Sequence, residues 1–417
     1  MGSRAPRQQP LEHRILLTAT FCLLAIGAVM VYSASSARAV LAGDGQATAY
    51  LVKYLIFGGV GLVLMHVLSR IPLAVVRRFT PVALLGAFVL LFLVLIPGVG
   101  VSINGARRWI GAGALQFQPS EVMKLALVLH VAAVIAARPK IASELRLVIA
   151  PVLAVGGLAV LLVAGQPDLG TALVISFTMA SLLVAAGLPL RQLGLVAAGG
   201  AVLVLIYAVI EPYRRERLTA FVNPWKDAAD TGFQSVQGQI AIGSGGLFGL
   251  GPGQSVQKDL YLPEGHTDFI LAILGEELGL AGITMLLVLY GLIAYAGLTT
   301  ARNAKGTYAK LLAAGVTSLI LCQALLNTWA VLGLAPLTGV PLPFISSGST
   351  SLIVLLSGMG LLLNVAAGGS AHLAALPARD PRREPAGRAT SAADRDRRRR
   401  NGGTRGPGDR GRRRAAG

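Results

Sequence analysis

The segment Glu264–Gly279 reads EGHTDFILAILGEELG and continues into LAGITMLLVLYGLIAYAGL at residues 280–298. An apolar run of this length predicts a helix that crosses a membrane. Its opening turns carry ionisable groups, and a charge inside a bilayer costs about 2.5 to 3.5 kcal/mol on insertion scales, so such groups indicate a functional site. We expect Asp268 at the water-facing end of the helix, with Glu276 and Glu277 about 12 Å deeper at about 1.5 Å per residue.

The whole chain has the composition of a polytopic membrane protein. Of its 417 residues, 54% are hydrophobic and only 13% are charged, whereas about 25% of the residues of a soluble domain are charged. Apolar runs of roughly 18 to 25 residues recur along the sequence. They predict an all-α fold with ten transmembrane helices, at about 14–34, 50–69, 74–97, 119–137, 146–164, 169–187, 191–211, 267–298, 308–332 and 345–366.

The charges of the short loops predict how these helices are oriented. Basic residues gather in alternate loops and in both tails, and such clusters stay in the cytoplasm. We therefore expect a cytoplasmic N-terminal tail at 1–13, the membrane domain at 14–366 and a disordered cytoplasmic tail at 367–417. From Arg379 onward this tail carries fourteen Arg against five acidic residues. It is either a topology signal or an electrostatic clamp on anionic membrane lipid, and no nucleic-acid-binding fold accompanies it.

Two loops on the predicted outer side carry basic residues against this rule. They are NGARRWIGAGALQFQPSE, with Arg107, Arg108 and Trp109, and EPYRRERLTAFVNPWKD, with Arg214, Arg215 and Arg217. A guanidinium presents a planar fork of donors that matches a phosphate. We interpret these cations as a site for an anionic lipid headgroup; the alternative is interfacial anchoring, in which Trp and Arg only mark the membrane boundary.

The loop at 211–266 is the longest between two predicted spans and is predicted to be extracytoplasmic. It contains the glycine-rich stretch GSGGLFGLGPG at Gly243–Gly253, which lacks the Lys-Ser/Thr ending of an ATP-binding P-loop. Two interpretations stay open for this stretch. It forms either a backbone nest for a pyrophosphate or a plain re-entrant turn.

Further polar residues fall at helix positions inside or at the edge of predicted spans. Glu121 and Lys124 stand at i and i+3 after Pro119, which predicts either a structural ion pair on one helix face or a membrane cation that helps to hold a substrate. Asp168 opens the sixth span, with Thr171 following, and is predicted to cap this helix; the alternative is a direct role in the site. No metal-ligand spacing appears in the sequence.

Several motifs, in order along roughly residues 12–366, resemble the SEDS proteins, which are polytopic polymerases of the bacterial cell wall. The motifs are NGARRWI, FQPSE followed by Lys124, QPDLGTA, AIGSGGLFG, GQSVQK, LPEGHTDFILAILGEELG and PLPFISSGSTS. GQSVQK and EGHTDF are more similar to division-type (FtsW-like) than to elongation-type (RodA-like) members. The last motif departs from the family pattern, because Ser347-Gly348-Ser349 stands where Tyr-Gly-Gly or Ala-Gly-Gly is usual.

The resemblance implies a SEDS fold and a peptidoglycan glycosyltransferase that links lipid II into glycan strands on the outer membrane face. It also implies a class B penicillin-binding protein and other division proteins as partners at the septum. The catalytic carboxylate of the family falls on Asp268, as general base for a sugar hydroxyl, and its outer-loop tryptophan falls on Trp109. From the residues alone, the alternative for Asp268 or Thr267 is helix capping.

The proposed reaction also needs groups that bind the substrate and stabilise the departing pyrophosphate. The candidates are Trp109, Arg107, Arg108, Lys124, Glu121, Arg214, Arg215, Arg217, His266, Ser346 and Ser347. A divalent cation, Mg²⁺ or Mn²⁺, could share the role of the cations, and the sequence predicts no certain cofactor. The competing hypotheses are a lipid II flippase or transporter and an elongation-type polymerase. Charged groups concentrate in the outer loops and outer helix ends, which favours an outward-facing enzyme.

Overall fold

The computed structural model describes residues 9–42, 47–103, 106–112, 115–138, 144–210, 221–229, 232–258, 262 and 265–368. Nine helices in these ranges are long and apolar enough to cross a membrane. They are α1 (Leu11–Ala42), α2 (Ala47–Leu68), α3 (Leu73–Leu95), α4 (Pro119–Ala137), the helical stretch Arg146–Gly165, α7 (Leu169–Ala186), α11 (Ile270–Asn303), α12 (Thr307–Val331) and α13 (Ser349–Ala366). The protein is a multi-pass membrane protein.

A further 21-residue helix, α8 (Leu190–Ile210), occupies the seventh predicted span. Every predicted span therefore has a helix at its place in the described chain, and the helical fold is confirmed. The fifth span is not one regular α-helix. It consists of α5 (Leu145–Val148), the π-helix η2 (Ile149–Ala154) and α6 (Val155–Gly165). Pro151 lies inside η2, and a proline has no N–H for the regular helical ladder, which accounts for the local change of helix type.

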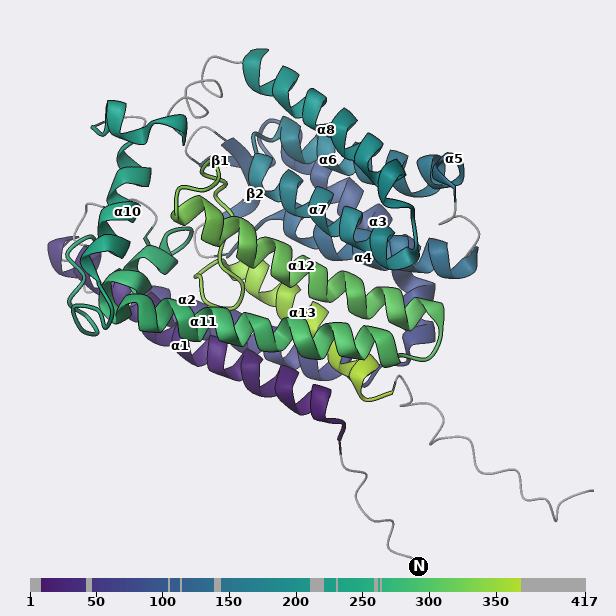
Figure 1. Ribbon diagram of the computed structural model, residues 1–417, viewed down its shortest axis with the longest axis horizontal. Helices are drawn as coiled ribbons and strands as arrows, with labels where there is room; N and C mark the ends of the chain where they lie inside the picture. Colours follow the sequence, from purple (N-terminus) through teal and green to yellow (C-terminus); the bar gives the residue numbers. More distant parts are fainter. Residues whose placement is uncertain are drawn as a thin grey trace, which may run out of the picture. The chain divides into compact units, whose positions relative to one another are not determined.

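The helices α12 and α13 form the inside of the bundle. In their apolar windows, 72% and 89% of the residues are buried, against 22% in α2 and in α3. Figure 1 shows α12 between α4 and α7 on one side and α11 on the other, and α12 packs against all three. The loop from α12 to α13 therefore starts and ends among buried helices, and it carries much of the site.

The helical fold has one addition that the sequence analysis did not predict, because the loop between α3 and α4 folds into a small antiparallel sheet. Its strands are β1 (Gly100–Ile103), β2 (Ala106–Ala112) and β3 (Leu115–Phe117), in the order β1-β2-β3. Residues 104 and 105, between β1 and β2, are Asn-Gly. This pair strongly favours a two-residue hairpin turn, so the sequence did hold a signal for the first two strands.

The loop at 211–266 contains a 3₁₀ turn, η3 (Pro224–Asp227), and the helix α10 (Phe233–Ser244), which packs against α11. The helix α11 itself is broken, because Gly279 has φ 67° and ψ −163° inside its 34 residues. The break separates a short first piece, which carries Glu276 and Glu277, from the long membrane-crossing piece.

Candidate active site

The span predicted at 267–298 would place Asp268 in the first turn of the helix. In the structure α11 begins at Ile270, and Asp268 lies just before it. Residues 265–269 form turns, and the N-cap position of α11 is Phe269, which makes no side-chain capping hydrogen bond. The residue at the cap is therefore neither Asp268 nor Thr267. Asp268 is partly exposed, while Phe269 and the residues that follow it are buried.

The backbone on which Asp268 stands is held by side chains from distant parts of the chain. The Nδ2 of Asn327 in α12 donates to the carbonyl of Asp268 at 2.8 Å. The Oγ of Ser346 donates to the carbonyl of Thr267 at 2.6 Å. Ser347 donates to the carbonyl of residue 266 twice, from its Oγ at 2.9 Å and its backbone N–H at 3.2 Å. Three consecutive carbonyls thus have partners from α12 and the α12–α13 loop.

The carboxylate of Asp268 lies over a glycine of the same loop. Gly339 has φ 64°, and a Cβ placed on it would lie 3.4 Å from Asp268 Oδ2. A left-handed backbone of this kind favours glycine. His266, two residues before Asp268, is buried and packs edge-to-face against Tyr50 of α2, with ring centroids 4.6 Å apart.

The stretch Val340–Phe344 is a non-helical segment inside the helical bundle. Irregular backbone at membrane depth needs partners from the protein, since lipid supplies none. Four carbonyls of this segment accept hydrogen bonds from side chains of α12, α11 and α2. The pairs are Val340 with Asn327 (2.8 Å), Pro341 with Gln323 (2.9 Å), Pro343 with Tyr290 (2.7 Å) and Phe344 with Tyr54 (2.6 Å). We call Gly339–Phe344 the floor segment.

The predicted ion pair on α4 is confirmed. Lys124 Nζ lies 2.8 Å from Glu121 Oε1, and both residues are 1% exposed. Lys124 also donates to Gln323 Oε1 at 2.6 Å, and the amide nitrogen of Gln323 bonds Pro341 O and Ser351 Oγ. The pair is therefore connected to the floor segment through one glutamine.

The two arginines of β2 point to different parts of the bundle. The register between β1 and β2 shifts between Val101 and Ser102, so that Val101 pairs with Trp109 and Ser102 with Arg107, which leaves Arg108 as the extra residue of a bulge. A bulge re-aims a side chain. Arg107 donates to the carbonyl of Leu95, at the end of α3, over 3.4 Å.

Arg108 binds the corner between α6 and α7. Its guanidinium donates to the carbonyls of Gln166 and Pro167 and lies 3.8 Å from Asp168 Oδ1. Asp168 caps α7 by accepting from the N–H of Thr171 at 3.2 Å, as predicted, and it also accepts from Gln118 Nε2 at 2.9 Å. This carboxylate thus ties the sheet, α4 and α7 together.

The remaining predicted cations cannot be placed. Arg214, Arg215 and Arg217 lie outside the described residues. Among the residues that are described, no three His, Cys, Asp or Glu side chains gather in a way that could hold a metal ion.

An apolar groove runs along the bundle next to this polar centre. Its volume is about 260 Å³, and its walls come from α3, β3, α4 and α13. Thr350, which helps to line it, accepts a hydrogen bond from the backbone N–H of Gln118 at 3.1 Å. The groove lining is Ala83, Phe117, Val122, Leu125, Ala126, Leu129, Thr350, Ile353, Val354 and Ser357.

Comparison with known proteins places this arrangement in a family. The sequence pattern of the cell cycle proteins FtsW, RodA and SpoVE matches residues 14–370. The chain belongs to this family. It is 41% identical over 354 residues to stage V sporulation protein E of Bacillus subtilis, covering 84% of this chain and 96% of that protein. It is 39% identical over 361 residues to a probable peptidoglycan glycosyltransferase FtsW of Coxiella burnetii, covering 84% and 95%.

Solved structures of relatives have the same fold. A chain from a peptidoglycan synthase complex, described as coordinating polymerization and crosslinking, superposes with a TM-score of 0.70 at 32% identity, covering 84% of this chain and 96% of that one. The rod shape determining protein RodA of Thermus thermophilus gives a TM-score of 0.60 at 30% identity, covering 84% and 95%. The family resemblance and the SEDS fold are confirmed.

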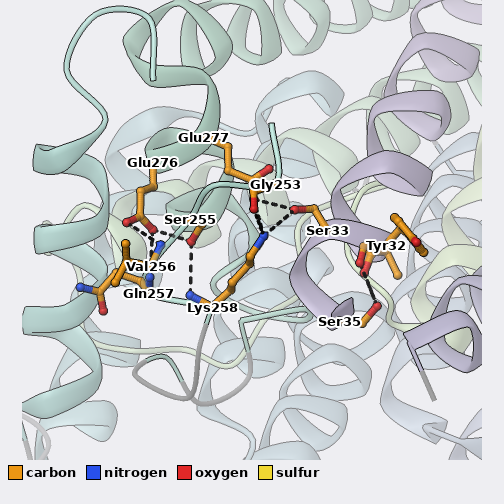
Figure 2. Close-up of polar contacts among 11 residues, drawn as sticks. Tyr32, Ser33, Ser35, Gly253, Ser255, Val256, Gln257, Lys258, Glu276 and Glu277 are labelled. Atoms are coloured by element: carbon orange, nitrogen blue, oxygen red, sulfur yellow. Dashed lines mark hydrogen bonds and ion pairs between the residues drawn. The ribbon is translucent and has the colours of Figure 1, made fainter. Parts of the chain in front are cut away.

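The glutamates of the family motif EGHTDFILAILGEELG bind the motif GQSVQK, as Figure 2 shows. Glu276 accepts from the Oγ of Ser255 and from the backbone N–H groups of Val256 and Gln257. Glu277 forms an ion pair with Lys258 at 3.4 Å and accepts from the Oγ of Ser33 in α1 at 2.5 Å. Both glutamates are 1% exposed. We call these contacts the glutamate cluster.

The glycines before GQSVQK serve close backbone packing against α11. A Cβ on Gly249 would lie 2.1 Å from the carbonyl of Glu277, and one on Gly279 would lie 2.4 Å from the N of Gly249. The N–H groups of Leu250 and Gly251 donate to the carbonyls of Glu276 and Glu277. These two N–H groups are used within the protein, which favours the interpretation of this stretch as a turn over the phosphate nest.

Sequence reasoning missed the four residues whose side chains bind the carbonyls of the floor segment. They are Asn327, Gln323, Tyr54 and Tyr290. Each is a polar side chain in an otherwise apolar span, and that is the signal that could have found them. Their partners are carbonyls far away in the sequence, which local patterns do not reveal.

Proposed function

We propose that this protein is a peptidoglycan glycosyltransferase that polymerises lipid II on the outer face of the cytoplasmic membrane, with Asp268 as general base. The observation that carries the proposal is the placement of Asp268. It is a partly exposed carboxylate on a backbone whose carbonyls are held by Asn327, Ser346 and Ser347, in a chain of the FtsW/RodA/SpoVE family. Relatives named as probable peptidoglycan glycosyltransferases support the substrate and the reaction.

The reaction inverts the anomeric carbon of one lipid II. A sugar hydroxyl of the second molecule loses its proton to Asp268 and forms the new C–O bond, while the bond from the anomeric carbon to the pyrophosphate oxygen breaks. General-base help of this kind contributes about 10² to 10⁴ in rate. A carboxylate does this best when its position is fixed before the substrate arrives, and the bonded carbonyls of residues 266–268 supply that rigidity.

The departing pyrophosphate needs positive charge, which is often a large part of catalysis in phosphate chemistry. We assign this role to the outer-loop cations. Arg108 already donates to two carbonyls and lies near Asp168, whereas Arg107 makes one long hydrogen bond to the carbonyl of Leu95, so Arg107 is the stronger candidate of the two. The charge of Lys124 is balanced by Glu121, and it acts by orienting Gln323 and bound substrate. The other proposed substrate contacts are Arg214, Arg215, Arg217 and His266. Ser346 and Ser347, which the sequence analysis offered as substrate contacts, donate to the carbonyls of Thr267 and His266, so we propose for them a role through this backbone instead.

The lipid part of the substrate needs an apolar path that opens next to the polar centre. The groove between α3, α4 and α13, with Phe117 and Thr350 at its wall, is the proposed path for a polyprenyl chain. A divalent cation, Mg²⁺ or Mn²⁺, could share the role of the outer-loop cations at the pyrophosphate. No step of the proposal depends on such an ion.

The orientation and the partners follow from the same proposal. Both tails, at 1–13 and 367–417, lie in the cytoplasm, and the loop at 211–266 is extracytoplasmic. A chain of similar fold comes from a peptidoglycan synthase complex, which supports a class B penicillin-binding protein transpeptidase as partner, together with other division proteins. The FtsW-like motifs favour the division septum over cell elongation.

The test is polymerisation of purified lipid II by the protein in liposomes with its partner transpeptidase. Wild type should form glycan strands, and Asp268→Asn should form them about 10² to 10⁴ times more slowly while it still folds and binds the partner. Near-normal polymerisation by Asp268→Asn would reject the base. If wild type moves lipid II across the bilayer but never links it, the flippase hypothesis replaces this one.

A further inference from the structure

We propose that Asn327, Ser346 and Ser347 are positioning residues for Asp268, a role that rests on the proposed function of that carboxylate. They form a carbonyl clamp, in which three side chains hold the three consecutive carbonyls of residues 266–268. Through these carbonyls the clamp sets the position of the Asp268 carboxylate.

The clamp is needed because the chain around Asp268 is not helical. Residues 265–269 form turns ahead of α11, and the carbonyls of residues 266–268 bind donors from α12 and the α12–α13 loop. Three side chains and one backbone N–H from α12 and the α12–α13 loop bind this backbone. Catalytic groups must stay within about 0.5 Å of their productive position, and a loop reaches that only when its backbone groups are bound.

Asn327 joins the two parts of the site that face each other. Its Nδ2 donates to the carbonyl of Asp268 and to the carbonyl of Val340, each at 2.8 Å. Both acceptors are carbonyls, so the amide must present its NH₂ group to them, and this fixes its orientation. Val340 follows Gly339, over which the carboxylate lies. One buried amide therefore sets the spacing between Asp268 and the floor segment.

The two serines complete the clamp from the end of the floor segment. Ser346 Oγ donates to the carbonyl of Thr267 at 2.6 Å and accepts from the N–H of Leu342 at 2.8 Å. The hydroxyl of Ser346 thus links the floor segment, at Leu342, to the turn before α11, at Thr267. Ser347 Oγ binds the carbonyl of His266 in parallel with its own backbone N–H, so its hydroxyl is partly redundant.

The chain offers a matched control for Asn327. Asn364 in α13 is also 2% exposed, and its Nδ2 also donates to two carbonyls, those of Leu68 (2.8 Å) and Ile71 (2.6 Å) in the turn between α2 and α3. Replacing either asparagine by alanine removes two amide-to-carbonyl hydrogen bonds of a residue that is buried to the same degree. Only Asn327 holds the backbone of Asp268.

The experiment compares Asn327→Ala, Asn364→Ala and Ser346→Ala with wild type in the liposome polymerisation assay, together with thermal unfolding of each. A misplacement of about 1 Å costs about 10²-fold in rate, so Asn327→Ala should lower kcat about 30-fold or more, with KM for lipid II within about twofold. Asn364→Ala should lower the unfolding temperature comparably and keep kcat within about threefold, since a loss of structure alone does not change the rate of folded molecules.

Ser346→Ala is the second test. It removes a single oxygen atom, so we expect this variant to fold even if Asn327→Ala does not. It should lower kcat about tenfold at unchanged KM. If Asn327→Ala and Ser346→Ala lose no more kcat than Asn364→Ala, the clamp is only structural and the inference fails. Inactivity of Asp268→Asn in the same assay would leave the proposed function standing in that case, so the two failures are distinguishable.

Discussion

Asp268 and the pair Glu276–Glu277 lie eight residues apart in one motif, but their environments are opposite. Asp268 is partly exposed, its carboxylate lies over Gly339, and its carbonyl accepts a hydrogen bond from Asn327. The two glutamates are buried, and their carboxylates themselves accept hydrogen bonds from Ser33 and from the loop Ser255–Lys258 (Figure 2). We propose that the first arrangement presents a carboxylate to a substrate, whereas the second uses carboxylates to hold a loop.

Asp268→Asn and Glu276→Gln should separate these two uses most strongly. The first should reduce polymerisation by about 10² to 10⁴ with little change in stability, because only the base is lost. The second should destabilise the protein by about 1 to 3 kcal/mol, because its buried donors lose a charged acceptor. Rates of polymerisation and unfolding in mild denaturant measure both. If Glu276→Gln matched Asp268→Asn in lost rate at unchanged stability, the comparison would be broken.

The ion pair of the glutamate cluster gives the next largest effect. Lys258→Met leaves the buried carboxylate of Glu277 without its cation, which costs about 3 to 5 kcal/mol when such a pair is broken from one side. Adding Glu277→Gln should recover most of this stability, since no uncompensated charge remains. A double-mutant cycle of unfolding free energies measures the recovery, and additive losses in the cycle would contradict the pairing.

Two glycines with left-handed backbone sharpen the comparison further. A Cβ at Gly279 meets backbone at 2.4 Å, whereas a Cβ at Gly339 lies at 3.4 Å from the nearest atom, the Asp268 carboxylate oxygen. Alanine in such a conformation costs about 1 to 3 kcal/mol, and Gly279→Ala should lose more stability because a backbone must also move. Gly339→Ala should mainly lower the rate. Thermal unfolding and kcat for both variants decide whether the two effects divide in this way.

Ser347→Ala should have the smallest effect. The backbone N–H of Ser347 still donates to the carbonyl of His266 at 3.2 Å after the hydroxyl is gone, so the clamp keeps all three carbonyls. We expect kcat within about threefold of wild type, on the scale of one weak net hydrogen bond. The same polymerisation assay measures it, and a loss as large as that of Ser346→Ala would show that the hydroxyl contacts substrate.

The sequence predicted the spans well because apolar run length is set by the membrane itself. It also predicted the Asp168 cap and the Glu121–Lys124 pair, since both depend on neighbours three residues apart. It predicted that the eighth helix begins at residue 267, whereas α11 begins at Ile270 and Asp268 lies in the turn before it. This turn is stabilised by Asn327 and Ser346, which are 59 and 79 residues away from their partners in the sequence. The small sheet was missed although its Asn-Gly pair was visible.

The floor segment was beyond local patterns for the same reason. Pro341 and Pro343 exclude a regular helix there, but nothing nearby in sequence says that amides and phenols of other helices bind its carbonyls. The role of the glycine-rich stretch likewise became clear only from the contacts of Gly249 and Gly279.

The carbonyls of Pro343 and Phe344 are neighbours, yet Tyr290 of α11 binds one and Tyr54 of α2 binds the other. These two hydrogen bonds hold the end of the floor segment at a fixed place between α2 and α11. Any movement of α2 relative to α11 must stretch or break one of these two tyrosine hydrogen bonds. Through the floor segment it would then shift Gly339, over which the Asp268 carboxylate lies.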